Sequence, residues 1–265
     1  MQFSAYSNRA FFKLLSFRLF IVLAYQMIAI VVGWHIYELT HDTLALGLIG
    51  QAEVIPYFSC ALFAGYAVDH HSRRLFGVLA SLMVFLSALT LTAVAVGWIS
   101  GNTLWWLYSA IAFNGVARAF ISPSYSSMFA IILPREEYAR ASSIGSSVFQ
   151  LALVVGPALG GILAGLAGKT AGYGVASLLS LGAASVLLSL RVKEPPPAES
   201  TPIFTSIASG LRFVFSNQVI LGAQSLDMFA VLFGGAVSML PAFIHDVFHY
   251  GHAASFHSRC VSLRA

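Results

Sequence analysis

Three ionisable side chains interrupt long apolar stretches of the sequence: Glu53, Arg118 and Asp227. Each lies about nine or more residues inside its stretch, which at about 1.5 Å per residue places it deep in the bilayer if the stretch is a membrane helix. A charge there costs about 2.5–3.5 kcal/mol on insertion scales, so such groups face a cavity or one another. We interpret the three as a coupling constellation: Arg118 pairs with Glu53 or Asp227, and the remaining carboxylate exchanges a proton. The alternative is an ion pair that only fixes helix register.

Polar and aromatic side chains in the same stretches could line a cavity suited to amphipathic organic molecules. Most aromatic residues of such a chain pack between helices or face lipid, so only a few are candidates. The candidates for a substrate cavity are Tyr25, Gln26, Phe113, Asn114, Gln150 and Gln224, with Tyr125 as a further aromatic wall.

The composition indicates that these stretches lie in lipid. Of 265 residues, 58% are hydrophobic and 9% charged, and the mean hydropathy is +0.82. A soluble domain carries roughly 25% charged residues, so a soluble enzyme and a nucleic-acid-binding protein are excluded. The two cysteines, Cys60 and Cys260, are too few for a disulfide-stapled secreted scaffold.

Seven apolar runs are long enough to cross a membrane, which takes about 20 residues. If the N-terminus is cytoplasmic, ten Lys and Arg residues lie in the inside segments and only Lys169 lies in an outside hairpin. Because basic residues gather in cytoplasmic loops, this asymmetry predicts a cytoplasmic N-terminus. The predicted spans are 17–37, 44–68, 75–97, 104–132, 141–166, 171–190 and 217–244.

Four regions follow from these spans. Residues 1–190 form a six-helix transmembrane half, and residues 191–216 form a proline-rich cytoplasmic linker that ends in an amphipathic surface helix. Residues 217–244 form the seventh span, and residues 245–265 form a polar tail that we expect not to be native to the fold. His245 and His249 are one helical turn apart near Asp246, but the end of a span and an unordered tail do not favour a metal site, so none is predicted.

The loop between the second and third spans carries Gly65, Asp69, Arg73 and Arg74. The glycine would let helices approach closely, and the carboxylate at the helix end could accept charge-assisted hydrogen bonds from the arginines across the turn. We interpret the loop as a cytoplasmic gating latch. Positive-inside anchoring alone is the simpler interpretation.

The fifth span carries Gly156, Pro157, Gly160 and Gly161, followed by Gly165. Glycines four residues apart share a helix face, so the pairs 156/160 and 161/165 predict close approach of a neighbouring helix. The proline removes one backbone hydrogen bond and predicts a bend. Tight packing is the plain interpretation, and bending for gating is the sharper one.

At these two motifs the sequence resembles the major facilitator superfamily. The loop is similar to that family's signature between its second and third helices, and the glycine–proline motif is similar to the signature of its antiporter branch. The resemblance covers about residues 8–250, and among branches it looks closest to bacterial enterobactin exporters and macrolide efflux proteins. Two positions depart from the family pattern: His70 replaces a basic residue, and Ile111 stands where the antiporter branch tends to carry an arginine.

The resemblance implies an all-α, polytopic membrane helix bundle: the N-terminal six-helix half of a major-facilitator fold plus a seventh helix. It implies a secondary active efflux transporter of small amphipathic molecules such as drugs or siderophores, coupled to protons, in the bacterial inner membrane. No cofactor and no enzymatic activity are expected. Family members rock two halves about a central site, so we expect a chain truncated or frameshifted near residue 251, inactive unless a C-terminal half or a second copy completes the cavity.

Other functions fit less well. A retinal protein would need a lysine in the seventh span, yet the lysines are Lys13, Lys169 and Lys193. A phospholipid head-group transferase would need several aspartates for a divalent metal, and the span that holds Arg118 has none. A non-transporting membrane scaffold or interaction protein is the alternative that stays open.

Overall fold

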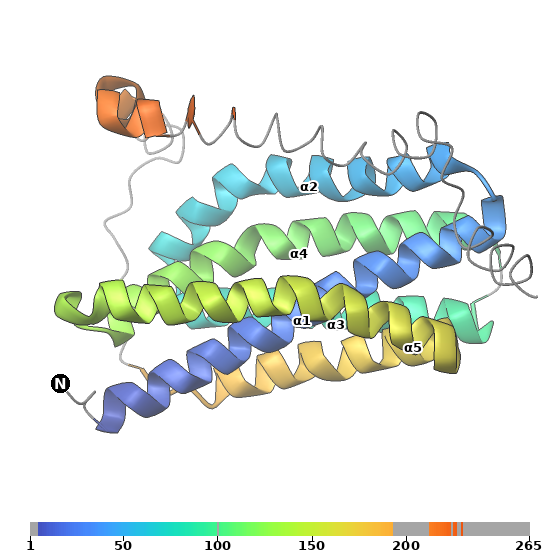
Figure 1. The fold of residues 1–265 in the computed structure, drawn as a ribbon, viewed down its shortest axis with the longest axis horizontal. Coiled ribbons are helices and arrows are strands. Elements are labelled where there is room, and N and C mark those ends of the chain that lie inside the picture. Colours follow the sequence, from blue (N-terminus) through green and yellow to red (C-terminus); the bar gives the residue numbers. More distant parts are fainter. Residues whose placement is uncertain (1–4, 100, 193–211, 224, 227–228, 230–265) are drawn as a thin grey trace, which may run out of the picture. The chain divides into compact units, whose positions relative to one another are not determined.

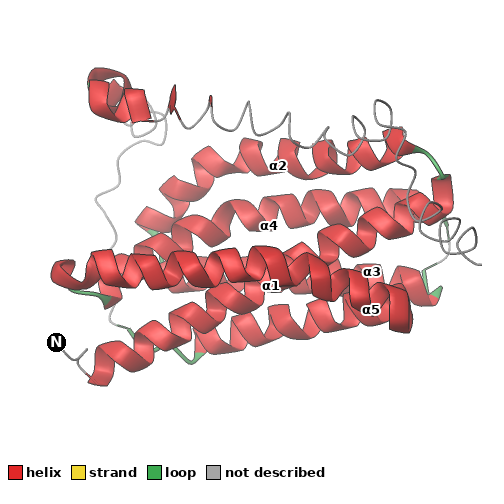
Figure 2. Cartoon of the chain, in the orientation of Figure 1, coloured by secondary structure: helices red, strands yellow, loops and turns green. Residues whose placement is uncertain are grey.

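The computed structural model describes residues 5–99, 101–192, 212–223, 225–226 and 229. The chain divides into two units, residues 1–203 and residues 204–265, and each is treated by itself. Every regular element in the described residues is helical, as Figure 2 shows. The all-α fold expected from the sequence is confirmed.

The described residues of the first unit form five long helices and one short 3₁₀ turn. Helix α5 covers the fifth and sixth predicted spans. The two spans meet at Gly168, whose φ of 81° and ψ of 164° are not helical. We call residues 138–167 its first segment and residues 169–188 its second segment. The elements are α1 (Ala5–Thr40), α2 (Thr43–His70), α3 (Arg73–Val96), α4 (Thr103–Ile132), η1 (Arg135–Glu137) and α5 (Tyr138–Leu188).

Local signals in the sequence set several helix ends. Asp42 caps the start of α2 by accepting a hydrogen bond from the Leu44 amide at 2.9 Å, and Ser72 caps α3 by accepting from the Leu75 amide at 3.3 Å. Helix α3 ends at Gly97, whose φ of 84° is the left-handed conformation that glycine adopts without strain. These short breaks reverse the chain between consecutive helices, of which α3 and α4 pack closely together whereas α2 and α3 barely touch.

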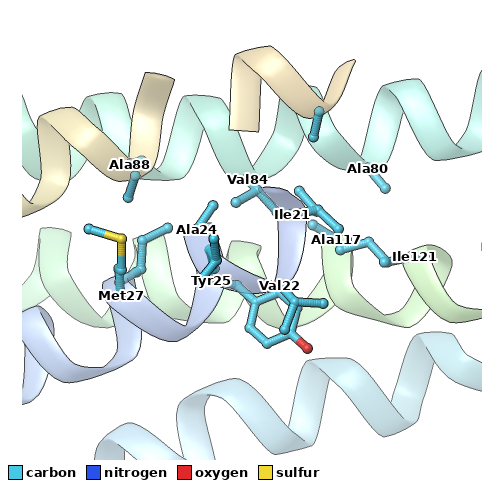
Figure 3. Close-up of a cluster of buried hydrophobic side chains, with 14 of the residues drawn as sticks. Ile21, Val22, Ala24, Tyr25, Met27, Ala80, Val84, Ala88, Ala117 and Ile121 are labelled. Carbon is cyan, nitrogen blue, oxygen red and sulfur yellow. The ribbon is translucent and has the colours of Figure 1, made fainter. Parts of the chain in front are cut away.

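The helices of the first unit pack in a definite pattern. Helix α5 lies against α1 and α3, and α4 lies against α2 and α3; Figure 1 shows α2 and α4 running side by side. The buried cluster at the centre joins α1, α3, α4 and α5, and Figure 3 shows its part around Ile21, Val84 and Ala117. Helix α1 therefore supplies a large share of the core, and its rotation fixes which of its side chains reach a cavity.

Among the described residues, five helical segments are long and apolar enough to cross a membrane, and α4 is not one of them. Helix α4 has 30 residues, but Asn114, Arg118 and several serines lower its hydropathy. Asn114 and Ser124 are fully buried, so α4 carries polar groups to the inside of the bundle. The five segments are Arg9–Thr40, Leu44–Ala61, Arg73–Val96, Arg135–Ala167 and Lys169–Leu188.

The outer surface of the bundle is apolar in a way that suits lipid. Leu86 on α3 is 51% exposed and Leu178 on α5 is 69% exposed. Trp98 and Trp105 are also exposed, beside the turn between α3 and α4, where an aromatic belt would meet the membrane interface. Exposed leucines of this kind would be costly in water and are favourable in a bilayer.

The second unit is described only in part. Residues 212–216 and 218–223 are helical, which covers the end of the predicted surface helix and the start of the predicted seventh span. Asp227, Gln224, most of the linker and the tail with His245 and His249 lie outside the described residues.

Candidate functional site

The ion pair expected from the sequence is formed between α2 and α4. Arg118 Nη1 lies 2.5 Å from Glu53 Oε1, and the exposed fractions of the two side chains are 32% and 14%. The pair is therefore partly exposed rather than sealed in the core. Of the two carboxylates that the sequence offered as partners of Arg118, Glu53 is the partner that the described residues show.

A glycine brings these two side chains together. Gly115 on α4 lies so close to α2 that a Cβ placed on it would collide with the backbone carbonyl oxygen of Glu53. Arg118 follows Gly115 by three residues and so lies on the same helix face. The backbone contact at Gly115 therefore holds the base of Glu53 within reach of the guanidinium.

Two further groups surround the ion pair. Asn114 Nδ2 donates to Glu53 Oε1 at 3.4 Å, while the buried Asn114 Oδ1 has no partner among the described residues. The Arg118 guanidinium carbon lies 4.3 Å from the centre of the Tyr25 ring, a cation–π contact worth about 0.5–2 kcal/mol depending on desolvation. Figure 3 shows the Tyr25 ring on α1 beside Val22.

A cavity of about 200 Å³ adjoins the pair, with walls from α1, α2, α4 and α5. A second guanidinium, that of Arg18, also lines it. The Arg18 Cζ lies 4.2 Å from the ring centre of Tyr125 and 4.8 Å from that of Phe149. The cavity thus combines two guanidinium groups with aromatic walls, and its chemically notable lining residues are Arg18, Tyr25, Tyr57, Arg118, Tyr125 and Phe149.

The candidate cavity residues from the sequence are only partly brought together. Tyr25 and Tyr125 line the cavity, and Asn114 contacts Glu53. Gln26 instead packs against Gly156, and Phe113 and Gln150 are exposed away from the lining. Among the charged and aromatic lining residues, Arg18, Tyr57 and Phe149 were not predicted from the sequence, because nothing in their spacing shows which way the helices are rotated.

The predicted gating loop contacts the end of α5. Arg74 Nη2 donates to the carbonyl oxygen of Leu188 at 2.5 Å, and Lys13 Nζ from α1 donates to that of Ser189 at 2.9 Å. Cations at these last carbonyls stabilise a helix C-terminus. Asp69 is exposed. No described atom lies within 4 Å of a Cβ placed on Gly65, so the close helix approach expected there is not formed in the described part of the chain.

The glycine motif of α5 behaves differently at its two glycine pairs. A Cβ on Gly156 would lie 2.7 Å from the Gln26 Cβ, and one on Gly160 would lie 3.1 Å from the Met27 Cα, so this pair packs tightly on α1. Gly161 and Gly165 meet no described atom within 4 Å, so they do not make the expected close contact. Helix α5 continues through Pro157, and its non-helical residue is Gly168.

Comparison with known proteins identifies the family of this chain. The family model described as "Major Facilitator Superfamily" matches residues 14–258. The chain belongs to the Major Facilitator Superfamily. It is therefore a multi-pass membrane protein of a transporter family rather than an enzyme.

Superfamily relatives include efflux proteins. The chain is 27% identical over 210 residues to "Multidrug efflux pump Tap" of Mycolicibacterium fortuitum, covering 74% of this chain and 50% of that protein. It is 22% identical over 131 residues to "Macrolide efflux protein A" of Streptococcus pyogenes, covering 48% of this chain and 32% of that protein. The chain thus spans about half the length of the first curated relatives it matches.

Solved structures agree on the fold. The chain aligns with a crystal structure of the peptide transporter POT in complex with sulfate at a TM-score of 0.57 and 16% identity, covering 96% of this chain and 55% of that one. At this identity the likeness shows a shared fold alone.

Proposed function

We propose that this chain is the transport unit of an efflux protein that moves small amphipathic molecules such as drugs or siderophores across the bacterial inner membrane in exchange for protons. Its superfamily membership and the efflux pumps among its relatives support export. The observation that carries the proposal is the Glu53–Arg118 ion pair beside a cavity between membrane-length helices.

The proposed coupling follows from the chemistry of the pair. A proton delivered to Glu53 removes its charge and releases the Arg118 guanidinium, which then remains over the Tyr25 ring and open to the cavity. Loss of the proton restores the ion pair. Because Tyr25 belongs to α1, while Glu53 and Arg118 belong to α2 and α4, the proton state of one carboxylate bears on the packing of three helices.

The proposed gating uses the contacts around α5. The first segment packs on α1 through Gly156 and Gly160, and the end of the second segment accepts hydrogen bonds from Arg74 and Lys13. In this proposal the loop from Gly65 to Arg74 holds the cytoplasmic ends of the helices in one state, with the N-terminus in the cytoplasm. The glycine seam lets the first segment tilt without breaking its backbone hydrogen bonds.

The test is transport of a dye in proteoliposomes under an imposed pH gradient. The chain, as a self-assembled dimer or reconstituted together with the C-terminal half of a full-length relative, should move rhodamine 6G or carboxyfluorescein against its concentration gradient only when the pH gradient is present. Glu53→Gln, which cannot take up and release a proton, should lower this rate at least tenfold. Glu38→Gln is the matched control. Glu38 Oε2 lies 2.8 Å from Lys169 Nζ in an ion pair, and neither residue lines the cavity. Undiminished pH-driven transport by Glu53→Gln would overturn the coupling.

Asp227 provides a second test of proton coupling. It lies outside the described residues. Because Arg118 pairs with Glu53, Asp227 is the remaining carboxylate that the sequence offers for proton exchange. Asp227→Asn, made at the corresponding position of a full-length working relative, should abolish proton-driven efflux while the protein remains as abundant in the membrane. Immunoblotting and dye efflux measured on the same cells check this, and undiminished efflux would remove Asp227 from the mechanism.

A further inference from the structure

The two guanidinium groups of the cavity are not balanced alike. Arg118 has a carboxylate partner, Glu53. In the part of the chain that the structure describes, Arg18 lies within ion-pair distance of no carboxylate, and its contacts are the ring faces of Tyr125 and Phe149. The described walls of the cavity therefore carry one positive charge that no described acidic group neutralises.

Aromatic faces hold Arg18 in place without using its hydrogen-bond donors. A ring face attracts the guanidinium through its quadrupole, but the five N–H groups of the fork still need acceptors. The described residues supply no acceptor for them, although the guanidinium lines the cavity. A planar, bidentate oxyanion is the acceptor that best matches the geometry of this fork.

The hydroxyl of Tyr125 supplies a second donor at the same place. Its oxygen is buried and has no hydrogen-bond partner among the described residues. Gly145 of α5 packs directly on both groups, since a Cβ there would lie 2.7 Å from the Tyr125 hydroxyl oxygen and 3.5 Å from Arg18 Nη1, so the hydroxyl and the guanidinium lie beside the same point of α5. A buried hydroxyl left unpaired costs about 1–3 kcal/mol, so an acceptor that reaches both groups is favoured.

The other walls suit an apolar body. Tyr25, Tyr57 and Phe149 line the cavity with rings, and Val22 and Ile121 add aliphatic surface. We propose that this cavity selects amphipathic organic anions, with a carboxylate or similar oxyanion between Arg18 and the Tyr125 hydroxyl and an aromatic body against Tyr25, Tyr57 and Phe149. The inference rests on the proposed function in taking this cavity as the place where the transported molecule binds.

Binding of three probes with one skeleton tests the charge preference. The full chain is purified in a non-ionic detergent and titrated at pH 7 with 2-naphthoate, 2-naphthylmethylammonium and 2-naphthalenemethanol, and the heat of binding is measured. The dissociation constant for 2-naphthoate should be at least tenfold lower than for the other two. Equal affinity for all three probes, or tighter binding of the ammonium, would overturn the inference.

Substitutions locate the effect. Arg18→Gln should weaken 2-naphthoate binding at least tenfold and leave 2-naphthalenemethanol unchanged, because it removes the charge and keeps a polar side chain. Tyr125→Phe should weaken 2-naphthoate binding severalfold and serves equally if Arg18→Gln does not fold. Arg135→Gln is the matched control, since it removes an exposed arginine of η1 away from the cavity, and it should bind like the unaltered chain.

The outcomes separate this inference from the transport proposal. Binding of 2-naphthoate that neither Arg18→Gln nor Tyr125→Phe weakens would show attachment elsewhere and overturn the inference, whatever the transport result. A chain that binds 2-naphthoate with the expected charge preference, yet moves no dye under a pH gradient even when a second copy or a C-terminal half completes the cavity, would sustain the anion site and overturn the proposed function.

Discussion

At the scale of single residues, the ion pair between Glu53 and Arg118 matters most. Each side chain would be unfavourable alone in a bilayer, and together they also engage Asn114 and the Tyr25 ring. Removing one member leaves the other charge partly buried with no counter-ion, and removing both leaves two neutral groups. The energetic penalty should therefore depend strongly on which combination is removed.

A double-mutant cycle measures this dependence. Arg118→Gln and Glu53→Gln should each destabilise the chain, whereas the double variant should be destabilised by at least about 1 kcal/mol less than the sum of the two. The free energy of unfolding is measured in detergent for all four proteins. Strict additivity would mean that the two side chains do not interact as the structure places them.

At the scale of helices, small residues decide which faces meet. Gly115 sets the α2–α4 contact, and Gly156 and Gly160 set the α1–α5 contact. The sequence offered more glycines than the packing uses, since Gly65, Gly161 and Gly165 meet no described neighbour. A glycine is therefore needed for packing only where a Cβ would meet the backbone or a side chain of another helix.

Alanine at two positions separates these cases. Gly115→Ala should destabilise the chain by about 1–3 kcal/mol, because its Cβ would push α4 away from the Glu53 carbonyl. Gly161→Ala places the same methyl group in open space and should be neutral or stabilise by up to about 1 kcal/mol through helix propensity. Thermal unfolding followed by tryptophan fluorescence compares the two, and equal effects would contradict the assigned α2–α4 contact.

At the scale of the whole molecule, the helices were predictable and their rotations were not. Apolar runs and turn-forming residues indicate α1 to α4 and both segments of α5. The cost of buried charge predicts that Arg118 pairs with Glu53 or Asp227, and the structure shows the pair with Glu53. Arg18, by contrast, looks like an ordinary cytoplasmic anchor in the sequence. Its place in the cavity depends on the rotation of α1 and on the close packing of Gly145 against it, which no periodicity encodes.

The account as a whole requires a water-accessible cavity inside a lipid-facing bundle, and cysteine labelling tests this most directly. In a chain with Cys60 and Cys260 replaced by serine, Ser122→Cys places a thiol in the cavity lining and Leu178→Cys places one on the apolar outer surface. The rate of reaction with a charged, membrane-impermeant maleimide is measured in membranes opened to both sides. We predict that the thiol at position 122 reacts at least tenfold faster than the one at 178; equal rates, or faster reaction at 178, would contradict the account.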